Sequence, residues 1–412
     1  MSAAAKKGVR LKAQRDKDAK EAEARERQAA QALRPVVRDV LSTKKMPWPE
    51  KEDRIAHALR SMLGKVGRFY RTVEGVPLFF RTADRKVYEI SGRAETDFGR
   101  YVTYLCDFSV RVPPLFRSID RVRAVVAQSA PIVQLHGLAH NTAGLDVVAV
   151  NDFGGGMWFR KRGGKWMWRP NGYEGILFWT PSGIVEPWEP EFGFDWLEDS
   201  KYLDWLIHQA HFAEHVLTIH DQRMLMRALV LAPFFPALGK NRPIHAHLGL
   251  DDRRQHDTGK TTTGKMLGLV FVGSKFEPLP PPEGNEKGQE ALALELAHKP
   301  FVLLDNVDTD IKWLNDFLCT YCTGAAPSKR KLYTDTQQVT IEYRGRLIIT
   351  SRKPSFKRPD TASRTIPFRF EPIAPEERKT EWELLTPITE RRGKVWAGVL
   401  AASAASRTSS LS

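Results

Sequence analysis

The short polar segment Thr258-Gly259-Lys260-Thr261-Thr262 constrains the fold of this 412-residue chain more than any other feature. An apolar stretch typical of a strand, residues 243–250, precedes it, and a stretch with a helical pattern, residues 261–272, follows it. Strand, glycine-containing loop and helix are the local structure of a phosphate-binding P-loop, because N–H groups at the helix N-terminus point at the phosphates. We therefore expect this segment to bind ATP and Mg²⁺ through Gly259, Lys260, Thr261 and Thr262, with Lys260 on the β- and γ-phosphates and Thr261 on the metal.

The loop before Gly259 departs from the usual spacing of this motif. The chain has Arg254 where that spacing puts a glycine, and it has Asp257 at a position that is often glycine in such loops. The nearest upstream glycine, Gly249, makes the loop about five residues longer than usual. These departures fit either a loop that binds phosphate in a remodelled form or a loop that binds it weakly. If the Gly-Lys-Thr triplet is considered alone, the alternative is a chance turn before a helix.

A second strand-like run, residues 301–304, ends in Asp305, 45 positions after Lys260. An apolar strand with a terminal acid at this distance has the Walker B form, so we expect Asp305 to hold Mg²⁺ and to lie with Lys260 at neighbouring strand ends. Many ATPases place a second acid next, to polarise the attacking water. Here that residue is Asn306, and Asp308 is the nearest substitute. A buried strand that merely ends in Asp is the alternative.

A third strand-like run, residues 346–351, ends in hydroxyl side chains. In ring ATPases the polar residue at this strand end senses the γ-phosphate, which makes Thr350 or Ser351 the candidate, with Arg352 beside them. Farther along, Arg364 is positioned to act as a finger donated to the ATP of a neighbouring subunit. The alternative for Arg364 is a surface arginine paired with Asp360.

Basic residues are concentrated in two parts of the chain, whose formal net charge is +14. Residues 1–46 hold 13 Lys and Arg against 6 Asp and Glu, and residues 329–369 hold 11 against 3. This balance favours nucleic acid as a partner. For residues 1–46, contact with DNA phosphates and a purely solubilising role both fit.

Three adjacent cations, Lys329, Arg330 and Lys331, precede a strand-like run at residues 339–343. Together they predict a basic hairpin inserted before the third strand. Such a hairpin fits sequence-independent contact with DNA phosphates. An exposed basic turn is the alternative.

The cysteines and aromatic residues constrain the function less than these motifs do. Three cysteines provide no disulfide framework, and no signal peptide or membrane span is visible, so we expect a cytoplasmic protein without a membrane partner. The Cys319–Cys322 pair lacks further metal ligands and is interpreted as structural. The aromatic residues among the turns of residues 131–188 fit a core better than a base-stacking surface.

The fold class predicted from these patterns is α/β, with a P-loop NTPase core preceded by a smaller α+β domain and a helical linker. The expected segments are a basic arm, frayed or disordered, at 1–46, the α+β domain at 47–195, the helical connector at 196–240, the P-loop ATPase domain at 241–372 and a charged C-terminal tail at 373–412.

The motifs together resemble a known family. The run of residues 301–308, the segments Trp313-Leu314-Asn315-Asp316 and Arg330-Lys331-Leu332-Tyr333, the strand end Thr350-Ser351-Arg352 and Arg364 are similar to the primase-helicase ATPases of phages and mobile elements, relatives of superfamily 3 and poxvirus-type replicative helicases. The resemblance covers about residues 130–372. It implies a homo-oligomeric, often hexameric, ring with ATP at the subunit interfaces that unwinds or translocates on DNA, single-stranded DNA being the expected substrate.

Three functions remain in competition at this point. The first is a DNA-dependent ATPase of the helicase type. The second is a nucleotide-gated DNA-binding or assembly protein with little or no hydrolysis, which the altered loop and Asn306 favour. The third is a P-loop kinase, against which the basic hairpin and Arg364 argue.

Overall fold

The computed structural model describes residues 3–180, 183–193, 196–238, 241–250, 258–307, 311–324, 328–330, 338–340, 345–351 and 358–405. The chain forms two compact units, one from Met1–His136 and Arg169–Ser182, the other from Gly137–Trp168 and Gly183–Ser412. This division differs from the expected boundaries, because residues 137–168 and 183–195 of the expected α+β domain belong to the second unit.

The first unit combines helices with a small antiparallel sheet in which β2 lies between β1 and β3. Its elements are α1 (Ala3–Ser42), α2 (Trp48–Val66), β1 (Gly67–Arg71), β2 (Pro77–Arg81), β3 (Lys86–Glu89), α3 (Asp97–Cys106), α4 (Pro113–Ser129), β4 (Leu135–His136) and β9 (Leu177–Phe178). Local signals explain the helix starts: α3, for example, begins after Thr96, whose hydroxyl accepts a hydrogen bond from the Gly99 N–H at 3.0 Å.

Helix α1 corrects the expectation of a frayed or disordered arm at residues 1–46. Small apolar residues recur every three or four positions along its second half, so they form a narrow stripe that packs against α2 and α3. Glu26, on the same stripe, is buried and accepts two hydrogen bonds of 2.6 Å from Arg81 of β2. Alanine supplies much of the stripe, which is why the composition of this segment suggested disorder. The buried apolar residues are Ala22, Ala29, Ala30, Leu33, Val37 and Val40.

The second unit is built on a four-stranded sheet in which every pairing is parallel. Its strands lie in the order β11 (Phe301–Leu304), β14 (Arg346–Ser351), β10 (Ile244–Gly249) and β15 (Thr365–Phe370). The three strands predicted from the sequence are confirmed by β10, β11 and β14, and the mixture of helix and parallel sheet confirms the α/β class. Because the strands are parallel, their carboxyl ends share one edge of the sheet.

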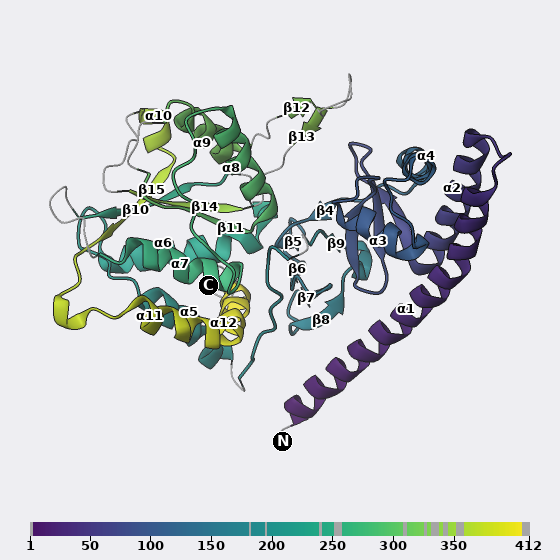
Figure 1. The fold of residues 1–412 in the computed structure, drawn as a ribbon. Coiled ribbons are helices and arrows are strands. Elements are labelled where there is room, and N and C mark those ends of the chain that lie inside the picture. Colours follow the sequence, from purple (N-terminus) through teal and green to yellow (C-terminus); the bar gives the residue numbers. More distant parts are fainter. Residues whose placement is uncertain are drawn as a thin grey trace. The chain divides into compact units, whose positions relative to one another are not determined.

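Helices cover both faces of this sheet (Figure 1). Helix α7 (Lys260–Phe271) packs on one face, and α8 (Glu286–His298) and α9 (Leu314–Thr323) pack on the other. Successive residues of β11 alternate between the two cores: Phe301 and Leu303 join the cluster of α7, whereas Val302 and Leu304 join that of α8 and α9. Burial on both faces explains the continuous apolar runs of these strands.

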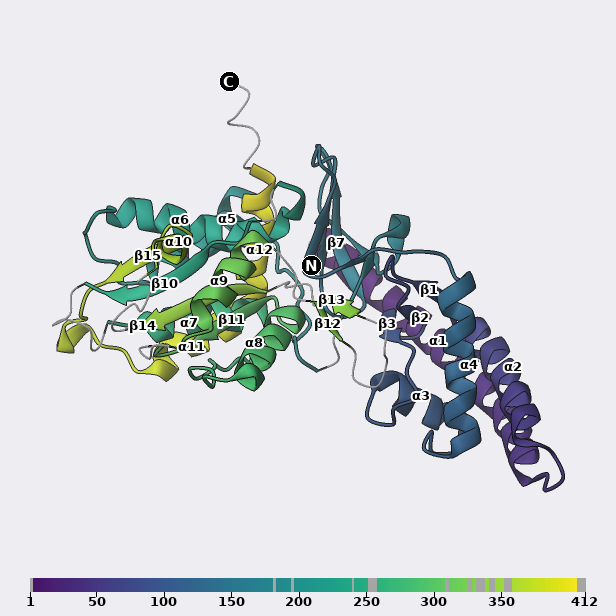
Figure 2. The same cartoon turned by 90° about the horizontal axis from the view of Figure 1, so that it is seen from above.

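The segments expected as a connector and a tail are parts of the core of the second unit. They form α5 (Trp196–His208), α6 (Ile219–Leu231), α11 (Glu381–Glu390) and α12 (Arg392–Ala405), which lie on the α7 side of the sheet (Figure 1; Figure 2 gives the view from above). Trp396 of α12 has no exposed surface, stacks on Trp188 with ring centroids 3.7 Å apart, and donates a hydrogen bond to the Val270 carbonyl. The small and apolar residues of α12 form a helix buried on nearly all sides, which corrects the expectation of a charged, frayed tail.

A second, mainly antiparallel sheet completes this unit. It contains β5 (Ala139–Asn141), β6 (Val147–Asn151), β7 (Gly156–Lys161) and β8 (Met167–Pro170), in that order. The core role predicted for the aromatic residues is confirmed for Trp166, which is buried and donates its Nε1–H to the Leu400 carbonyl at 3.0 Å, and for the buried Phe178 of the first unit.

Two further features are absent from the described residues. No cluster of three or more His, Cys, Asp or Glu side chains that could hold a metal ion occurs among them. None of their helices combines the length and apolar character needed to cross a bilayer. Cys322 is buried in the core of α8 and α9, as expected of a structural residue.

The burial of α12 makes a prediction about stability. Trp396→Ala removes a fully buried, stacked indole, so it should lower the free energy of unfolding of the second unit by about 3–5 kcal/mol. The matched control is Trp382→Ala in α11, where the side chain is 74% exposed and the loss should stay within about 0.5 kcal/mol. Urea denaturation followed by circular dichroism measures both. Equal losses in the two variants would show that α12 is not a core helix.

Candidate functional site

The Gly-Lys-Thr triplet lies at the start of α7, after the carboxyl end of β10. Gly259 occupies the N-cap position with a left-handed φ of +72°, a conformation that favours glycine. Lys260 is the first helical residue and is buried, with 8% of its surface exposed. Residues 251–257, which include Arg254 and Asp257, lie outside the described residues.

The first turn of α7 suits an anion. It contains Lys260, Thr261 and Thr262 and no acidic residue. The first N–H groups of any α-helix lack acceptors within the helix, and the helix dipole places a partial positive charge of about half an elementary charge at this end. Phosphate groups are the ligands that such helix termini bind most readily.

Asp305, directly after β11, is in contact with two of the other predicted site residues. Its Oδ1 accepts a hydrogen bond from the Thr261 hydroxyl at 2.7 Å and one from the Thr350 hydroxyl at 2.5 Å. The result is a cluster of one carboxylate and two hydroxyl groups at the carboxyl edge of the sheet. Oxygen ligands of this kind are the ones that Mg²⁺ prefers, so the residues present fit this metal.

The strand order changes one detail of the expected geometry. Lys260 and Asp305 were expected at neighbouring strand ends, but β14 lies between β10 and β11. Thr350, at the end of β14, bridges the gap through its contact with Asp305. Successive residues of a strand point to opposite faces, so Ser351 cannot share the direction of Thr350. Thr350 is therefore the better of the two sensor candidates.

The turn after Asp305 is held by the same threonine. The Asn306 N–H donates to the Thr350 hydroxyl and the Val307 N–H donates to the Thr350 carbonyl, both at 2.9 Å. Asn306 has a left-handed φ of +55°, a conformation that asparagine tolerates better than most residues. The sequence indicated that a second acid is missing here, but it did not predict the left-handed turn. Asp308 and Arg352 lie outside the described residues.

Arg364 does not lie at the cluster of Asp305, Thr261 and Thr350. It directly precedes β15, and the Ile244 N–H at the start of β10 donates to its carbonyl at 3.0 Å. Since β10 and β15 are parallel, Arg364 lies at the amino edge of the sheet, opposite Asp305. Within one chain it is therefore remote from the helix terminus of α7.

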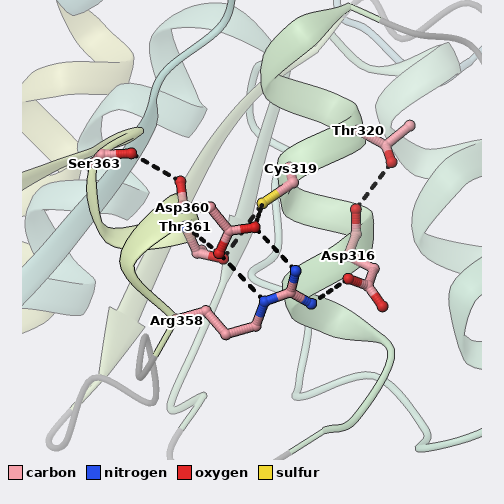
Figure 3. Close-up of polar contacts among 7 residues, drawn as sticks. All are labelled: Asp316, Cys319, Thr320, Arg358, Asp360, Thr361 and Ser363. Carbon is pink, nitrogen blue, oxygen red and sulfur yellow. Dashed lines mark hydrogen bonds and ion pairs between the residues drawn. The ribbon is translucent and has the colours of Figure 1, made fainter.

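A network of polar contacts fixes the segment that leads to Arg364 (Figure 3). Arg358, next to α10 (Pro359–Ala362), forms an ion pair with Asp316 of α9 and hydrogen bonds of 2.9 and 3.2 Å with Asp360. Cys319 lies 3.5 Å from the Asp360 carboxylate. Asp360 thus pairs with Arg358, and this removes the main argument for reading Arg364 as the surface partner of Asp360. The role of Arg358 was not recognised in the sequence, although an arginine two positions before an aspartate was the available signal.

The predicted basic hairpin exists at the level of the backbone. Strands β12 (Ser328–Arg330) and β13 (Gln338–Thr340) pair in antiparallel register, with Lys329 opposite Val339 and Arg330 opposite Gln338. Lys331 lies outside the described residues. The two strands form a sheet of their own, separate from the parallel sheet that they precede.

Two buried histidines on β10 were not singled out from the sequence, although an alternating His-x-His in an apolar strand is a visible signal. His247 has no exposed surface, and its Nδ1–H donates to the Lys260 carbonyl at 3.2 Å. This contact fixes the backbone of the first residue of α7. Burial lowers the pKa of His245 to about 3 and that of His247 to about 4, so both rings are neutral near pH 7.

The second unit is similar to one known protein family. Residues 218–410 match the sequence model of the actinomycete integrative conjugative element replication protein family. None of the curated proteins matches the chain. Over this region the chain is thus similar to replication proteins of mobile elements.

Solved structures give weaker likenesses. The apo C-terminal region of NrS-1 (305-718) shares 12% identity over 83% of this chain and 68% of its own, with a TM-score of 0.39. A JCV helicase bound to a thiazolopyridine acetamide compound shares 17% identity over 50% of this chain and 54% of its own, with a TM-score of 0.29. These scores do not establish a shared fold.

The buried histidines generate a prediction about pH. In the unfolded chain a histidine has a pKa of about 6.5, so below this pH the unfolded state binds more protons than the native state. The stability that depends on neutral His247 is therefore present above about pH 6.5 and is lost as the pH falls towards about 4. His247→Asn retains a donor for the Lys260 carbonyl but does not titrate, so it should flatten the decline of the urea midpoint over this range.

The control is the exposed His220 of α6. His220→Asn should leave the decline unchanged. If the urea midpoint fell equally steeply with pH in wild type and in His247→Asn, the ring of His247 would not be kept neutral by burial.

Proposed function

We propose that the second unit binds MgATP at the carboxyl edge of its parallel sheet and hydrolyses it in a DNA-dependent manner, as a helicase-like or translocase-like ring ATPase in the replication of a mobile element. The observation that carries the proposal is the contact of Asp305 with both Thr261 and Thr350 beside the N-terminus of α7. The match of residues 218–410 to replication proteins of conjugative elements supports the biological setting.

In this proposal each residue has a defined task. Lys260 and the first N–H groups of α7 bind the phosphates, while Thr261 and Asp305 hold Mg²⁺. Thr350 orients Asp305 and lies where a γ-phosphate would be sensed. Mg²⁺, when bound, neutralises charge that develops on the transferred phosphoryl group.

Arg364 acts in this proposal on the ATP of a neighbouring subunit. Its position at the amino edge of the sheet, opposite the nucleotide site proposed for its own chain, supports action across an interface. The Arg358 network would then keep the Arg364 segment in place against α9. This requires a homo-oligomer, for which we propose the hexameric ring that the sequence resemblance implies.

The basic hairpin supplies the contact with single-stranded DNA in this proposal. Lys329 and Arg330 belong to β12 of a separate two-stranded sheet, and Lys331 follows them in the sequence, so three cations are adjacent in the chain before β14. Because Thr350 lies at the carboxyl end of β14 (Arg346–Ser351), movement of this hairpin and events at the γ-phosphate would be mechanically connected.

A second candidate function is a nucleotide-gated switch that binds ATP with little turnover. The specific observation in its favour is Asn306, which stands where a catalytic acid is common and whose left-handed turn is fixed by Thr350. ATP binding without DNA-stimulated hydrolysis would select this function.

The proposal predicts how two variants behave alone and together. Wild-type ATP turnover should rise with single-stranded DNA, and Lys260→Ala should reduce it by about 10²-fold or more because the phosphates lose a pre-positioned cation. Arg364→Ala should reduce turnover by about 10³-fold while ATP binding stays near normal. Mixing the two variants should restore part of the activity. At some interfaces an Arg364→Ala subunit then supplies an intact ATP site and its Lys260→Ala neighbour supplies an intact Arg364.

Arg111→Ala serves as the charge-matched control, because Arg111 is an exposed arginine of the first unit. It should leave turnover unchanged. A mixture no more active than its components would refute action across an interface, and turnover that ignores DNA in a monomeric protein would refute the ring ATPase.

A further inference from the structure

A second basic hairpin, in the β5–β8 sheet, has no role in the function proposed above. Its strands β7 and β8 are joined by residues 162–166. From Gly156 to Trp168 the chain contains four basic residues and no acidic residue. They are Arg160, Lys161, Arg162 and Lys165.

The end of this hairpin, residues 161–165, is exposed throughout and is called the β7–β8 tip below. Arg162 lies 3.4 Å from the carboxylate of Asp146, but the two side chains are 65% and 61% exposed. Such surface pairs are screened by water and salt and contribute little. The tip therefore keeps a net positive charge towards solvent.

Hydrogen bonds fix the chain next to the β7–β8 tip. Directly before β8 the Trp166 Nε1–H donates to the Leu400 carbonyl at 3.0 Å, and within β8 the Trp168 Nε1–H donates to Asp152 at 2.6 Å. Inside the turn the Gly164 N–H donates to the Lys161 carbonyl at 2.9 Å. These contacts restrain the backbone on either side of the turn, which lowers the entropic cost of binding a ligand there.

Glycine at the turn leaves room for close approach. Gly163 has a left-handed φ of +71°, and a Cβ added to it would meet no atom within 4 Å. The space beside the backbone at Gly163 is therefore open to a polyanion.

We propose that the β7–β8 tip binds the phosphate backbone of duplex DNA. Lys161, Arg162 and Lys165 offer point charges that suit phosphates and carry no sequence information. Sites for single strands commonly add aromatic side chains on which bases stack, but at this tip Trp166 is buried and Trp168 is half-buried with its N–H bound to Asp152. Charge without a stacking surface fits a duplex. That the polyanion is DNA rests on the proposed role in replication.

The test removes the charge of the tip from the full-length protein. In the variant Lys161→Gln/Arg162→Gln/Lys165→Gln three phosphate contacts are lost, so affinity for a labelled duplex should fall about tenfold or more. The dependence of log K on log salt should become shallower by about 2.7, since each contact to B-DNA contributes about 0.9. Fluorescence anisotropy without ATP, repeated over a salt series, measures both quantities.

The control removes the same charge from dispersed sites. Lys275, Lys287 and Lys379 are exposed residues of the same unit, and their triple substitution by Gln should leave both quantities nearly unchanged. Thermal unfolding of both variants establishes that they are folded.

A tip variant that binds duplex as tightly as the control would overturn the proposal, and so would an equal loss of affinity for a single-stranded oligonucleotide. The tip variant should retain ATP turnover stimulated by single-stranded DNA. Loss of duplex affinity in a protein whose turnover never responds to DNA would instead leave the tip proposal intact and contradict the proposed ATPase.

Discussion

One carboxylate oxygen, Oδ1 of Asp305, receives hydrogen bonds from hydroxyl groups of two other elements, and this contact connects the ends of β11 and β14 to the first turn of α7. The parallel sheet makes the contact possible, because it brings the carboxyl ends of separate strands to one edge. A helix terminus, a carboxylate and two hydroxyls at that edge form a set of groups suited to a metal-bound triphosphate. The rest of the second unit can be understood as support for this arrangement.

Helix α7 is held at both ends. At its C-terminus, Arg392 of α12 is buried and donates hydrogen bonds to the carbonyls of Val270, Pro187 and Glu186, and Trp396 donates to Val270 as well. Burial lowers the pKa of Arg392 to about 10, which still leaves it charged near pH 7, and a cation at a helix C-terminus is favourable. The C-terminal helices therefore fix the position of the helix whose first turn carries Lys260 and Thr261.

How far the sequence predicts this structure depends on the kind of signal. Long apolar runs predicted β10, β11 and β14, and the motifs predicted that Thr261 and Asp305 share one metal and that Thr350 or Ser351 lies near the phosphates; the contacts of Asp305 with Thr261 and Thr350 agree with this expectation. Burial of α1 and α12 was missed, because stripes of alanine and other small residues have little hydrophobic contrast with a polar tail. The interposed position of β14, the turn at Asn306 and the Arg358 network depend on strand order and tertiary contacts, which no local pattern encodes.

The central claim is that Asp305 and its hydroxyl partners hold the magnesium of bound MgATP. It is tested most directly by the affinity for ATP measured with and without Mg²⁺ in wild type and in Asp305→Asn. The account predicts that Mg²⁺ strengthens ATP binding to wild type, that this gain largely disappears in the variant, and that metal-free binding is similar in both. An undiminished magnesium effect in Asp305→Asn, or no binding of ATP to wild type, would contradict it.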